Sequence, residues 1–130
     1  MYSTHQKGLL GELEFTLHFV KQGYTVLSPM NPNSSYDLVI EKGGKFTRIQ
    51  IKYCTLTHGV LRVELERPNR NILPYNKREV DAIGAFEAKH HKFYLIPLDK
   101  TSTKSEFRLR VEKAKNSQKK HIHWASDFEI

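Results

Sequence analysis

The sequence predicts one small domain of the α+β or mixed α/β class. The chain has 130 residues, of which 38% are hydrophobic, enough for one compact core but not for two. A segment with helical periodicity comes first, and several segments with the alternating pattern of strands follow it. A leading helix that feeds a run of strands is typical of this class. No internal repeat, low-complexity tract or linker divides the chain, so we expect a single domain over residues 1–130.

The first element is a predicted helix that begins at a cap on Thr4, continues to about Val20 and ends at Gly23. At about 100° per residue, its apolar side chains form one broad arc. The arc consists of Leu9, Leu10, Leu13, Leu17 and Val20, with Phe15 and Phe19 at one side. We expect this arc to face the sheet.

One charged residue does not fit the helix pattern. Lys7, Glu14, His18 and Lys21 fall on the opposite, solvent-facing side, whereas Glu12 projects into the apolar arc. A carboxylate is costly in such a position unless a cation lies against it. Glu12 is therefore a candidate functional residue.

The remaining elements are strands and turns. The β-rich segments, in order, are 24–27, 36–41, 46–56, 60–65, 80–88, 93–98 and 107–111. A loop at 28–35, the pair Gly43-Gly44 and the polar turn 89–92 separate them. We expect a loop at 67–76, anchored by Leu73 and Tyr75, and we expect Trp124 and Phe128 to dock on the core.

Composition narrows the function. The net charge is +7, which favours a polyanionic partner, most plainly a nucleic acid. The alternative that the basic surface binds no polyanion stays open. No apolar run approaches the roughly 18 residues of a membrane span, and the first residues lack the apolar core of a signal peptide. The single cysteine, Cys54, suits a reducing cytosol, so we expect a cytoplasmic protein with no membrane partner.

The segment 46–53 carries the clearest chemical pattern. Phe46, and after a local irregularity Ile49, Ile51 and Tyr53, suggest an apolar face of a strand. Arg48, Gln50 and Lys52 then point together to the other face. Asp37 opens the preceding strand of the hairpin, so that strand pairing can bring it close to Gln50 and Lys52.

These residues supply oxygen ligands and one ammonium group. Carboxylate, amide and backbone carbonyl oxygens suit Mg²⁺, which keeps several waters and needs few protein ligands. A lysine beside them can orient or deprotonate an attacking water, or stabilise charge that develops on a phosphate. The spacing alone leaves an ordinary surface hairpin as the alternative.

Asp37, Gln50-x-Lys52 and the helical Glu12 together resemble the motif of the PD-(D/E)XK nuclease superfamily. The chain is similar, more specifically, to the small group I intron-encoded homing endonucleases of cyanobacteria within that superfamily. The similarity extends over segments 7–12, 80–86, 93–97, 108–110, 115–118 and 124–125. It therefore covers nearly the whole chain.

This resemblance implies a restriction-endonuclease-like core, with the N-terminal helix packed on a central mixed sheet. It assigns the catalytic set Glu12, Asp37, Gln50 and Lys52, and the metal ligands Glu12, Asp37, Gln50 and Ile51. Gln50 departs from the usual Glu or Asp, as it does in the homing subgroup, which leaves the second metal ligand open. The implied cofactor is Mg²⁺, with Mn²⁺ as a substitute.

The implied function is site-specific, Mg²⁺-dependent hydrolysis of phosphodiesters in double-stranded DNA, with intron homing as its role. Two alternatives remain, a junction-resolving nuclease of the same fold and a DNA-binding module without catalysis. Because one active site cuts one strand, we expect a homodimer at least. The homing subgroup favours a tetramer.

Positive charge is concentrated in two segments, 42–70 and 104–123, each with seven Lys or Arg and two Asp or Glu. In the second, we expect phosphate contacts from Lys113, Lys115, Lys119 and Lys120. In the first, the candidates for groove contacts are Arg48, Arg62, Arg67 and Arg70.

Two further patterns favour structural roles. His90-His91 and His121-x-His123 invite a zinc interpretation, but one cysteine and no further spaced pair do not complete such a site. We expect these histidines in turns or facing DNA. Cys54 is more typical of a small buried apolar residue than of a nucleophile, and the helical Gly8 and Gly11 allow close approach to the sheet or to another chain.

Overall fold

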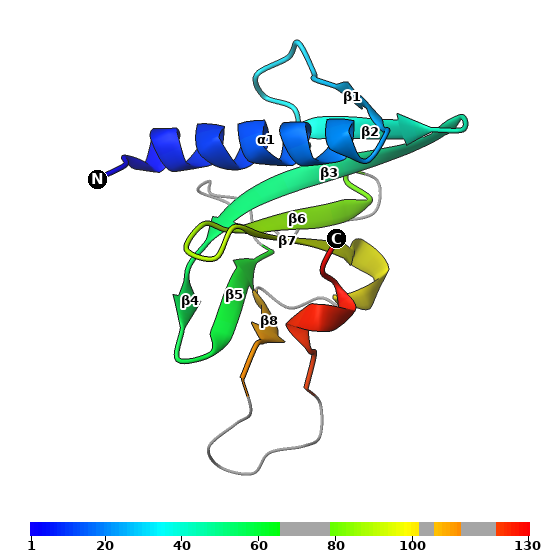
Figure 1. The fold of residues 1–130 in the computed structure, drawn as a ribbon. Coiled ribbons are helices and arrows are strands. Elements are labelled where there is room, and N and C mark those ends of the chain that lie inside the picture. Colours follow the sequence, from blue (N-terminus) through cyan, green and yellow to red (C-terminus); the bar gives the residue numbers. More distant parts are fainter. Residues whose placement is uncertain (66–78, 102–105, 113–121) are drawn as a thin grey trace.

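The computed structural model describes residues 1–65, 79–101, 106–112 and 122–130. A single long helix lies across a five-stranded sheet, and a smaller three-stranded sheet packs at the other side (Figure 1). The elements in chain order are α1 (Thr4–Lys21), β1 (Thr25–Leu27), β2 (Leu38–Lys42), β3 (Lys45–Cys54), β4 (Leu56–Thr57), β5 (Val60–Glu64), β6 (Ala82–Glu87), β7 (Lys92–Pro97), η1 (Leu98–Lys100), β8 (Glu106–Arg110) and η2 (Ala125–Asp127).

The larger sheet has the strand order β1-β2-β3-β6-β7, and the smaller sheet has the order β4-β5-β8. All neighbours are antiparallel except β3 and β6, which run parallel over six register pairs from Ile49↔Ala82 to Cys54↔Glu87. The sheet is therefore mixed, with a helix on one face, as the sequence predicted.

The helix begins one residue earlier than expected. Ser3, not Thr4, is the N-cap: its hydroxyl accepts a hydrogen bond from the Gln6 N–H, and the Gln6 side chain accepts one from the Ser3 N–H. This capping box satisfies two backbone donors that the first helical turn leaves open. At the other end Gly23 has a φ of 90°, a left-handed conformation that glycine adopts without strain.

The prediction of which face of α1 meets the sheet was right for Phe15 and Phe19 and wrong for the leucines of the arc. The buried residues are Gly11, Phe15 and Phe19, whereas Leu9, Leu13 and Leu17 of the predicted arc are at least half exposed. A Cβ at Gly11 would lie 3.2 Å from Ile51 Cγ2, so glycine lets the helix backbone sit close to β3. Because α1 is apolar on two sides, periodicity alone cannot choose between them.

Two cores hold the layers together. The first lies between α1 and the large sheet and contains Phe15, Phe19, Leu38, Ile40, Ile49, Ile51, Phe86 and Phe93. The second lies between the two sheets and includes Leu61, Val63, Ile83, Ile96 and Leu109, with Phe128 packed against it. Every residue of β6 is buried, as is expected for a central strand covered on both faces.

The side chains of β3 alternate between the two faces of the sheet without the expected irregularity. Ile49 and Ile51 face α1, and Phe46 therefore falls on the face of Arg48 and is 60% exposed, contrary to the prediction. The expected single run 46–56 is split, since β3 ends at Cys54 and β4 begins at Leu56.

At the chain's end the prediction is half right, because Phe128 packs on the core while Trp124 stays 37% exposed. The expected loop at 67–76, with Leu73 and Tyr75, lies outside the described residues. In the part of the chain that the structure describes, no helix is long and apolar enough to cross a membrane.

Candidate active site

The site forms where strand β2 leaves the edge of β3. The last register pair is Leu38↔Ile49, and the Asp37 N–H still donates to the Ile49 carbonyl at 2.9 Å. Beyond that point β2 no longer pairs with β3, and Asp37 Oδ2 accepts a hydrogen bond from the Ile51 N–H at 2.7 Å. The side-chain carboxylate thus provides the acceptor that a backbone carbonyl of a neighbouring strand would otherwise provide.

The same edge carries the other candidate groups on β3. By the alternation of a strand, the Ile51 carbonyl points to the same edge as its N–H. Gln50 and Lys52 pair through their backbones with Ile83 and Ala85 of β6, and their half-buried side chains project from the face opposite α1.

Glu12 reaches this edge from the helix. Its carboxylate is partly buried, and both burial and the negative charge of Asp37 raise its pKa. Burial also raises the pKa of Asp37, against the opposing effects of the Ile51 N–H and the Lys52 ammonium. The charge of Asp37 acts on Glu12 from one side and on Lys52 from the other, so Asp37 is the electrostatic centre of the site.

Lys52 has a further acidic neighbour that sequence analysis missed. Burial lowers the pKa of Lys52, and the largest opposing influence is Glu64, ahead of Asp37. Glu64 is the last residue of β5 and is exposed. In the sequence it looks like any polar residue at a strand end, because its position near Lys52 depends on how the second sheet packs on the first.

The donor set fits a hard divalent cation. Among the described residues, no three His, Cys, Asp or Glu side chains form a metal-binding group. The carboxylates of Glu12 and Asp37 are present instead, and the adjacent residues Gln50 and Ile51 of β3 carry further oxygen atoms. The charge of Asp37 raises the pKa of Glu12, which is the repulsion that a cation between them would relieve. Few protein oxygens, completed by water and phosphate, are what Mg²⁺ prefers.

Arg48, a predicted groove contact, is bound within the protein. Its guanidinium forms a bidentate ion pair with the Asp81 carboxylate, with N···O distances of 3.0 and 3.1 Å. The backbone N–H of Arg48 also donates a hydrogen bond to Asp81 Oδ2 at 2.8 Å. The interaction joins β3 to the residue just before β6. Arg48 thus has a structural role that its sequence pattern did not indicate.

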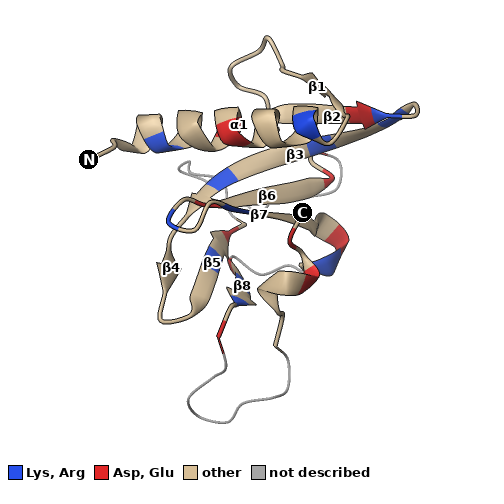
Figure 2. Cartoon of the chain, viewed as in Figure 1, with Lys and Arg blue, Asp and Glu red and all other residues tan. Residues whose placement is uncertain are grey.

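The other predicted DNA contacts divide into one described residue and six outside the described residues. Arg62 is exposed on β5 and stands directly across from Arg108 of β8. In Figure 2 the ribbons of β5 and β8 are blue where these strands carry Lys or Arg. The residues that lie outside the described residues are Arg67, Arg70, Lys113, Lys115, Lys119 and Lys120.

The histidines of the turn between β6 and β7 pair with acids. A ring nitrogen of His90 lies 3.0 Å from the buried Glu87, and His91 pairs with Glu14 of α1. His91 therefore ties this turn to the helix. Cys54 is buried, and burial raises the pKa of its thiol to about 12, which disfavours the thiolate that a nucleophile needs.

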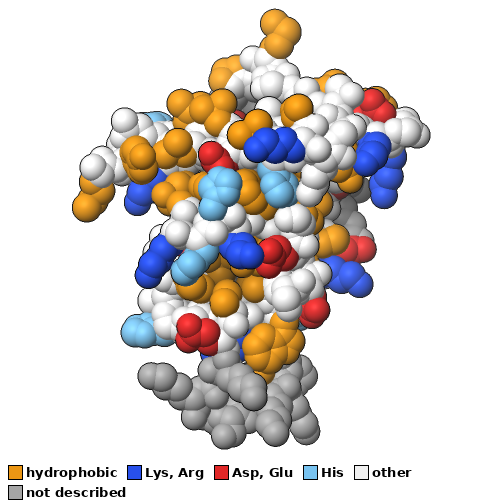
Figure 3. Space-filling model, in the orientation of Figure 1, with side chains coloured by type: hydrophobic (Ala, Val, Ile, Leu, Met, Phe, Trp, Pro, Cys, Tyr) orange, Lys and Arg blue, Asp and Glu red, His pale blue; other side chains and the backbone are white. Residues whose placement is uncertain are grey.

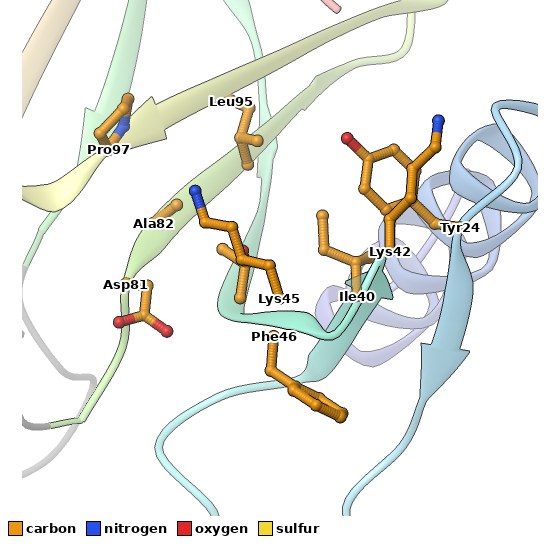
Figure 4. A pocket seen from close by; sticks show the side chains of 10 residues that line it. Tyr24, Ile40, Lys42, Lys45, Phe46, Asp81, Ala82, Leu95 and Pro97 are labelled. Carbon is orange, nitrogen blue, oxygen red and sulfur yellow. The ribbon is translucent and has the colours of Figure 1, made fainter.

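A cavity of about 570 Å³ lies elsewhere, against the helix-side face of the sheet (Figure 4). It is lined by Tyr24, Ile40, Lys42, Lys45, Phe46, Thr47, Asp81, Ala82, Leu95 and Pro97. None of the four predicted catalytic residues is among them. This cavity is therefore separate from the candidate site.

The chain is similar to known proteins over most of its length. The sequence profile described as PD-(D/E)XK endonuclease matches residues 2–130. The solved structure of a bacterial homing endonuclease, I-Ssp6803I, is 29% identical and superposes with a TM-score of 0.79, over 98% of this chain and 89% of that one.

A curated relative, Protein 5.3 of Escherichia phage T7, is 42% identical over 55 residues. That match covers 42% of this chain and 47% of the phage protein. The chain therefore matches about half the length of this relative.

Proposed function

The chain belongs to the PD-(D/E)XK endonuclease family, and from this premise we propose that it is a Mg²⁺-dependent endonuclease that cuts double-stranded DNA at a specific site. The observation that carries the proposal is the open edge of β3. There the carboxylate of Asp37 is fixed by the Ile51 N–H at 2.7 Å, and its charge acts on both Glu12 and Lys52.

Each residue has a chemical role in this proposal. Asp37 and Glu12, with the Ile51 carbonyl and the Gln50 amide oxygen, would hold the cation. A bound divalent cation would supply Lewis-acid polarisation of a phosphoryl oxygen. Lys52 donates hydrogen bonds to the scissile phosphate and opposes the negative charge that grows on it during attack by water. Glu64 favours the charged form of that lysine.

Several observations support a DNA substrate. The net charge of +7 favours binding to phosphate backbones. The site lies on an open edge, and Arg62 and Arg108 stand side by side on the exposed face of the second sheet. Arg67, Arg70, Lys113, Lys115, Lys119 and Lys120 are proposed as further contacts.

The homing endonuclease that shares this fold supports a homing role. We infer that the protein cuts a long target and, because each site cuts one strand, works as a dimer or a tetramer. Mn²⁺ would replace Mg²⁺ at the same oxygen ligands.

A second function is favoured by one residue. Gln50 supplies a neutral oxygen where the motif of the family has a carboxylate, and a weakened metal site is what a non-catalytic DNA-binding module would retain.

A cleavage assay separates the two functions. Supercoiled plasmid that carries a sequence bound by the protein is incubated with the full chain and Mg²⁺, Mn²⁺ or a chelator. We expect nicked and linear products with either metal and none with chelator. Bound but intact plasmid at every metal concentration would favour the binding module and overturn the nuclease.

A further inference from the structure

A second candidate site lies beside the C-terminal end of α1, away from the strand edge that carries Asp37. It is the cavity of about 570 Å³, a volume within the range of small-molecule sites in proteins. Apolar side chains of the large sheet, Ile40, Ala82 and Leu95, form its floor, and lysine, tyrosine and threonine side chains line it as well (Figure 4). An apolar surface with a few polar groups is the usual composition of a ligand site.

The two lysines of the cavity face each other across the tip of the β2–β3 hairpin. Gly43 and Gly44 form a two-residue turn with φ angles of 61° and 82°, and such a turn needs left-handed values at both positions. Lys42 and Lys45 are therefore the last register pair, and Lys or Arg side chains gather where this tip lies, at the right of Figure 3. Like charges directly opposite each other on paired strands are destabilising. An anion bound between the two ammonium groups would relieve this repulsion.

The contacts of Lys42 hold it in place without neutralising it. Its Nζ donates a hydrogen bond to the Gln22 carbonyl at 3.2 Å and lies 5.0 Å from the centre of the Tyr24 ring. Both partners are neutral, and an ammonium group has further N–H donors to offer. Neither Lys42 nor Lys45 forms an ion pair with another residue in the part of the chain that the structure describes.

Asp81 also lines the cavity, but its charge is already compensated. The Arg48 guanidinium holds its carboxylate at 3.0 and 3.1 Å. Arg48 is the main cause of the lowered pKa of Asp81, and Lys45 contributes less. With three positive side chains against one negative side chain, this end of the sheet keeps a net charge of +2.

We propose that the cavity binds a nucleoside monophosphate, with the phosphate between Lys42 and Lys45 and the base on the apolar floor. A phosphate monoester carries about −1.5 to −2 charges at pH 7, which matches the charge of the two lysines. Charged N–H donors form strong hydrogen bonds to phosphate oxygens. Every nucleobase has flat faces that pack on nonpolar side chains, here those of Ala82 and Leu95.

The same cavity favours a nucleotide over simpler anions. Inorganic phosphate would leave the apolar floor exposed to water, and an acidic peptide side chain carries one charge and no flat ring. The hydroxyl groups of Tyr24 and Thr47 line the cavity too, and each can donate and accept a hydrogen bond. They are suited to the sugar and to the polar edge of a base.

The ligand is not the scissile nucleotide of the proposed reaction. Ile40 and Thr47 are a register pair on the face of the sheet that meets α1, whereas Gln50 and Lys52 project from the opposite face. A free nucleotide and the 5′-phosphorylated end of an unpaired DNA strand both present the required chemistry, a monophosphate beside a base.

Titration of the isotope-labelled full chain with deoxyadenosine monophosphate (dAMP) and a chelator tests the site by nuclear magnetic resonance. We expect saturable shifts of the Gly43 and Gly44 amide signals, which lie between the lysines, and no shift of the Ile51 amide signal at the candidate nuclease site. Lys45→Ala should raise the dissociation constant roughly tenfold, because it removes a charged donor to the phosphate. Lys21→Ala is the matched control, since Lys21 is an exposed lysine in the last turn of α1 that does not line the cavity.

Further ligands test the two halves of the site and its source of nucleotide. Deoxyadenosine lacks the phosphate and inorganic phosphate lacks the base, so each should bind at least roughly tenfold more weakly than dAMP. An unpaired oligonucleotide with a 5′-phosphate, compared with the same strand without it, shows whether DNA ends bind more tightly than free dAMP. Inorganic phosphate that binds as tightly as dAMP would overturn the assignment to a nucleotide.

A variant that fills the cavity gives an independent test. Thr47 is half-buried on β3 and lines the cavity, and phenylalanine suits a strand. Thr47→Phe should therefore fold, as circular dichroism would verify, and bind dAMP at least roughly tenfold more weakly. Equal affinities of folded Lys45→Ala, Lys21→Ala and the unaltered chain would overturn the site, as would unchanged amide signals at about 5 mM dAMP.

Nucleotide binding and DNA cleavage are separate outcomes. A chain that nicks plasmid but shows no shift of Gly43 and Gly44 with dAMP would refute the cavity site and leave the proposed function intact. A chain that binds dAMP at the hairpin but never cuts DNA would do the reverse.

Discussion

The carboxylate of Asp37 and the backbone N–H of Ile51 lie 2.7 Å apart, in a hydrogen bond that ends the pairing of β2 with β3. This bond fixes the first acidic residue of the site to the strand that carries Gln50 and Lys52. It also holds the carboxylate partly buried, which raises its pKa. A carboxylate that is both fixed and poorly hydrated is well prepared to receive a cation.

Asp37→Asn and Lys52→Ala should each reduce cleavage at least a hundredfold while DNA affinity changes less than about threefold. Asparagine keeps an oxygen that can accept from the Ile51 N–H, so the strand edge should persist. Single-turnover cleavage and a binding titration on the same duplex measure the two effects.

Asp99 and Lys100 are adjacent, exposed residues of η1. Asp99→Asn and Lys100→Ala therefore serve as matched control substitutions. These should cut normally. Parallel loss of binding and cleavage in folded Asp37→Asn or Lys52→Ala protein would refute their catalytic assignment.

Gln50→Glu should lower the Mg²⁺ concentration that gives half-maximal cleavage by about tenfold. A carboxylate binds a hard cation more strongly than an amide oxygen does. Gln50→Ala, which removes the oxygen, should raise the requirement instead. A Mg²⁺ titration of all three proteins gives the order, and equal requirements would show that Gln50 does not touch the metal.

Sequence reasoning placed the site more accurately than it placed the helix above it. Asp37, Gln50 and Lys52 are linked by hairpin pairing, and such pairing follows from local alternation and turn residues. The register Leu38↔Ile49 brings Asp37 to Ile51 as that pattern predicts. The metal ligands and DNA contacts themselves stay predictions.

The orientation of α1 and the neighbour Glu64 could not be predicted, for a common physical reason. Both depend on packing between layers that are distant in sequence. The helix has leucines on one side and phenylalanines on another, and the shape of the sheet beneath, with Phe86 and Phe93, selects the phenylalanine side. The ion pair of Arg48 could not be predicted for the same reason, since its partner Asp81 lies 33 residues further along the chain.

Gly84→Ala should destabilise the protein by about 1–3 kcal/mol and lower cleavage. A Cβ at Gly84 would lie 2.8 Å from Ile51 Cδ1 and 3.0 Å from Phe15 Cζ, so the side chains of Ile51 and Phe15, which pack α1 against β3, must move. Urea unfolding measures the free energy of unfolding.

Gly8→Ala is the opposite case, because no atom lies within 4 Å of a Cβ at Gly8. That variant should gain about 0.5–1 kcal/mol, since alanine favours the helix. Equal effects of the two substitutions would contradict the packing of α1 on β6.

Asp81→Asn should reduce stability at neutral pH by up to about 1 kcal/mol, as befits an ion pair whose two side chains are partly exposed. Arg48 holds the pKa of Asp81 below its ordinary value of 3.8. Ionised Asp81 therefore stabilises the folded protein at any pH above about 3.8. This contribution to the free energy of unfolding is lost as the pH falls through the lower pKa that Asp81 has in the folded state.

Unfolding by urea at pH 7 and near pH 2.5 should show the variant's deficit at the first pH and little at the second. Glu106→Gln, which breaks the more exposed pair with Arg108, is the control and should change little at either pH. A deficit for Asp81→Asn that does not depend on pH would rule out the ion pair as its source.

The parallel pairing of β3 with β6 sets the order in which the protein can be assembled. Ile49 lies beside Ala82, so this central pair closes a long loop, and such non-local contacts form slowly. The hairpin of β2 and β3 can form early from neighbouring residues. On a ribosome, however, the strand that carries Gln50 and Lys52 gains its second neighbour only after β6 has been synthesised. The nascent chain therefore completes the candidate site only after β6 has emerged from the ribosome.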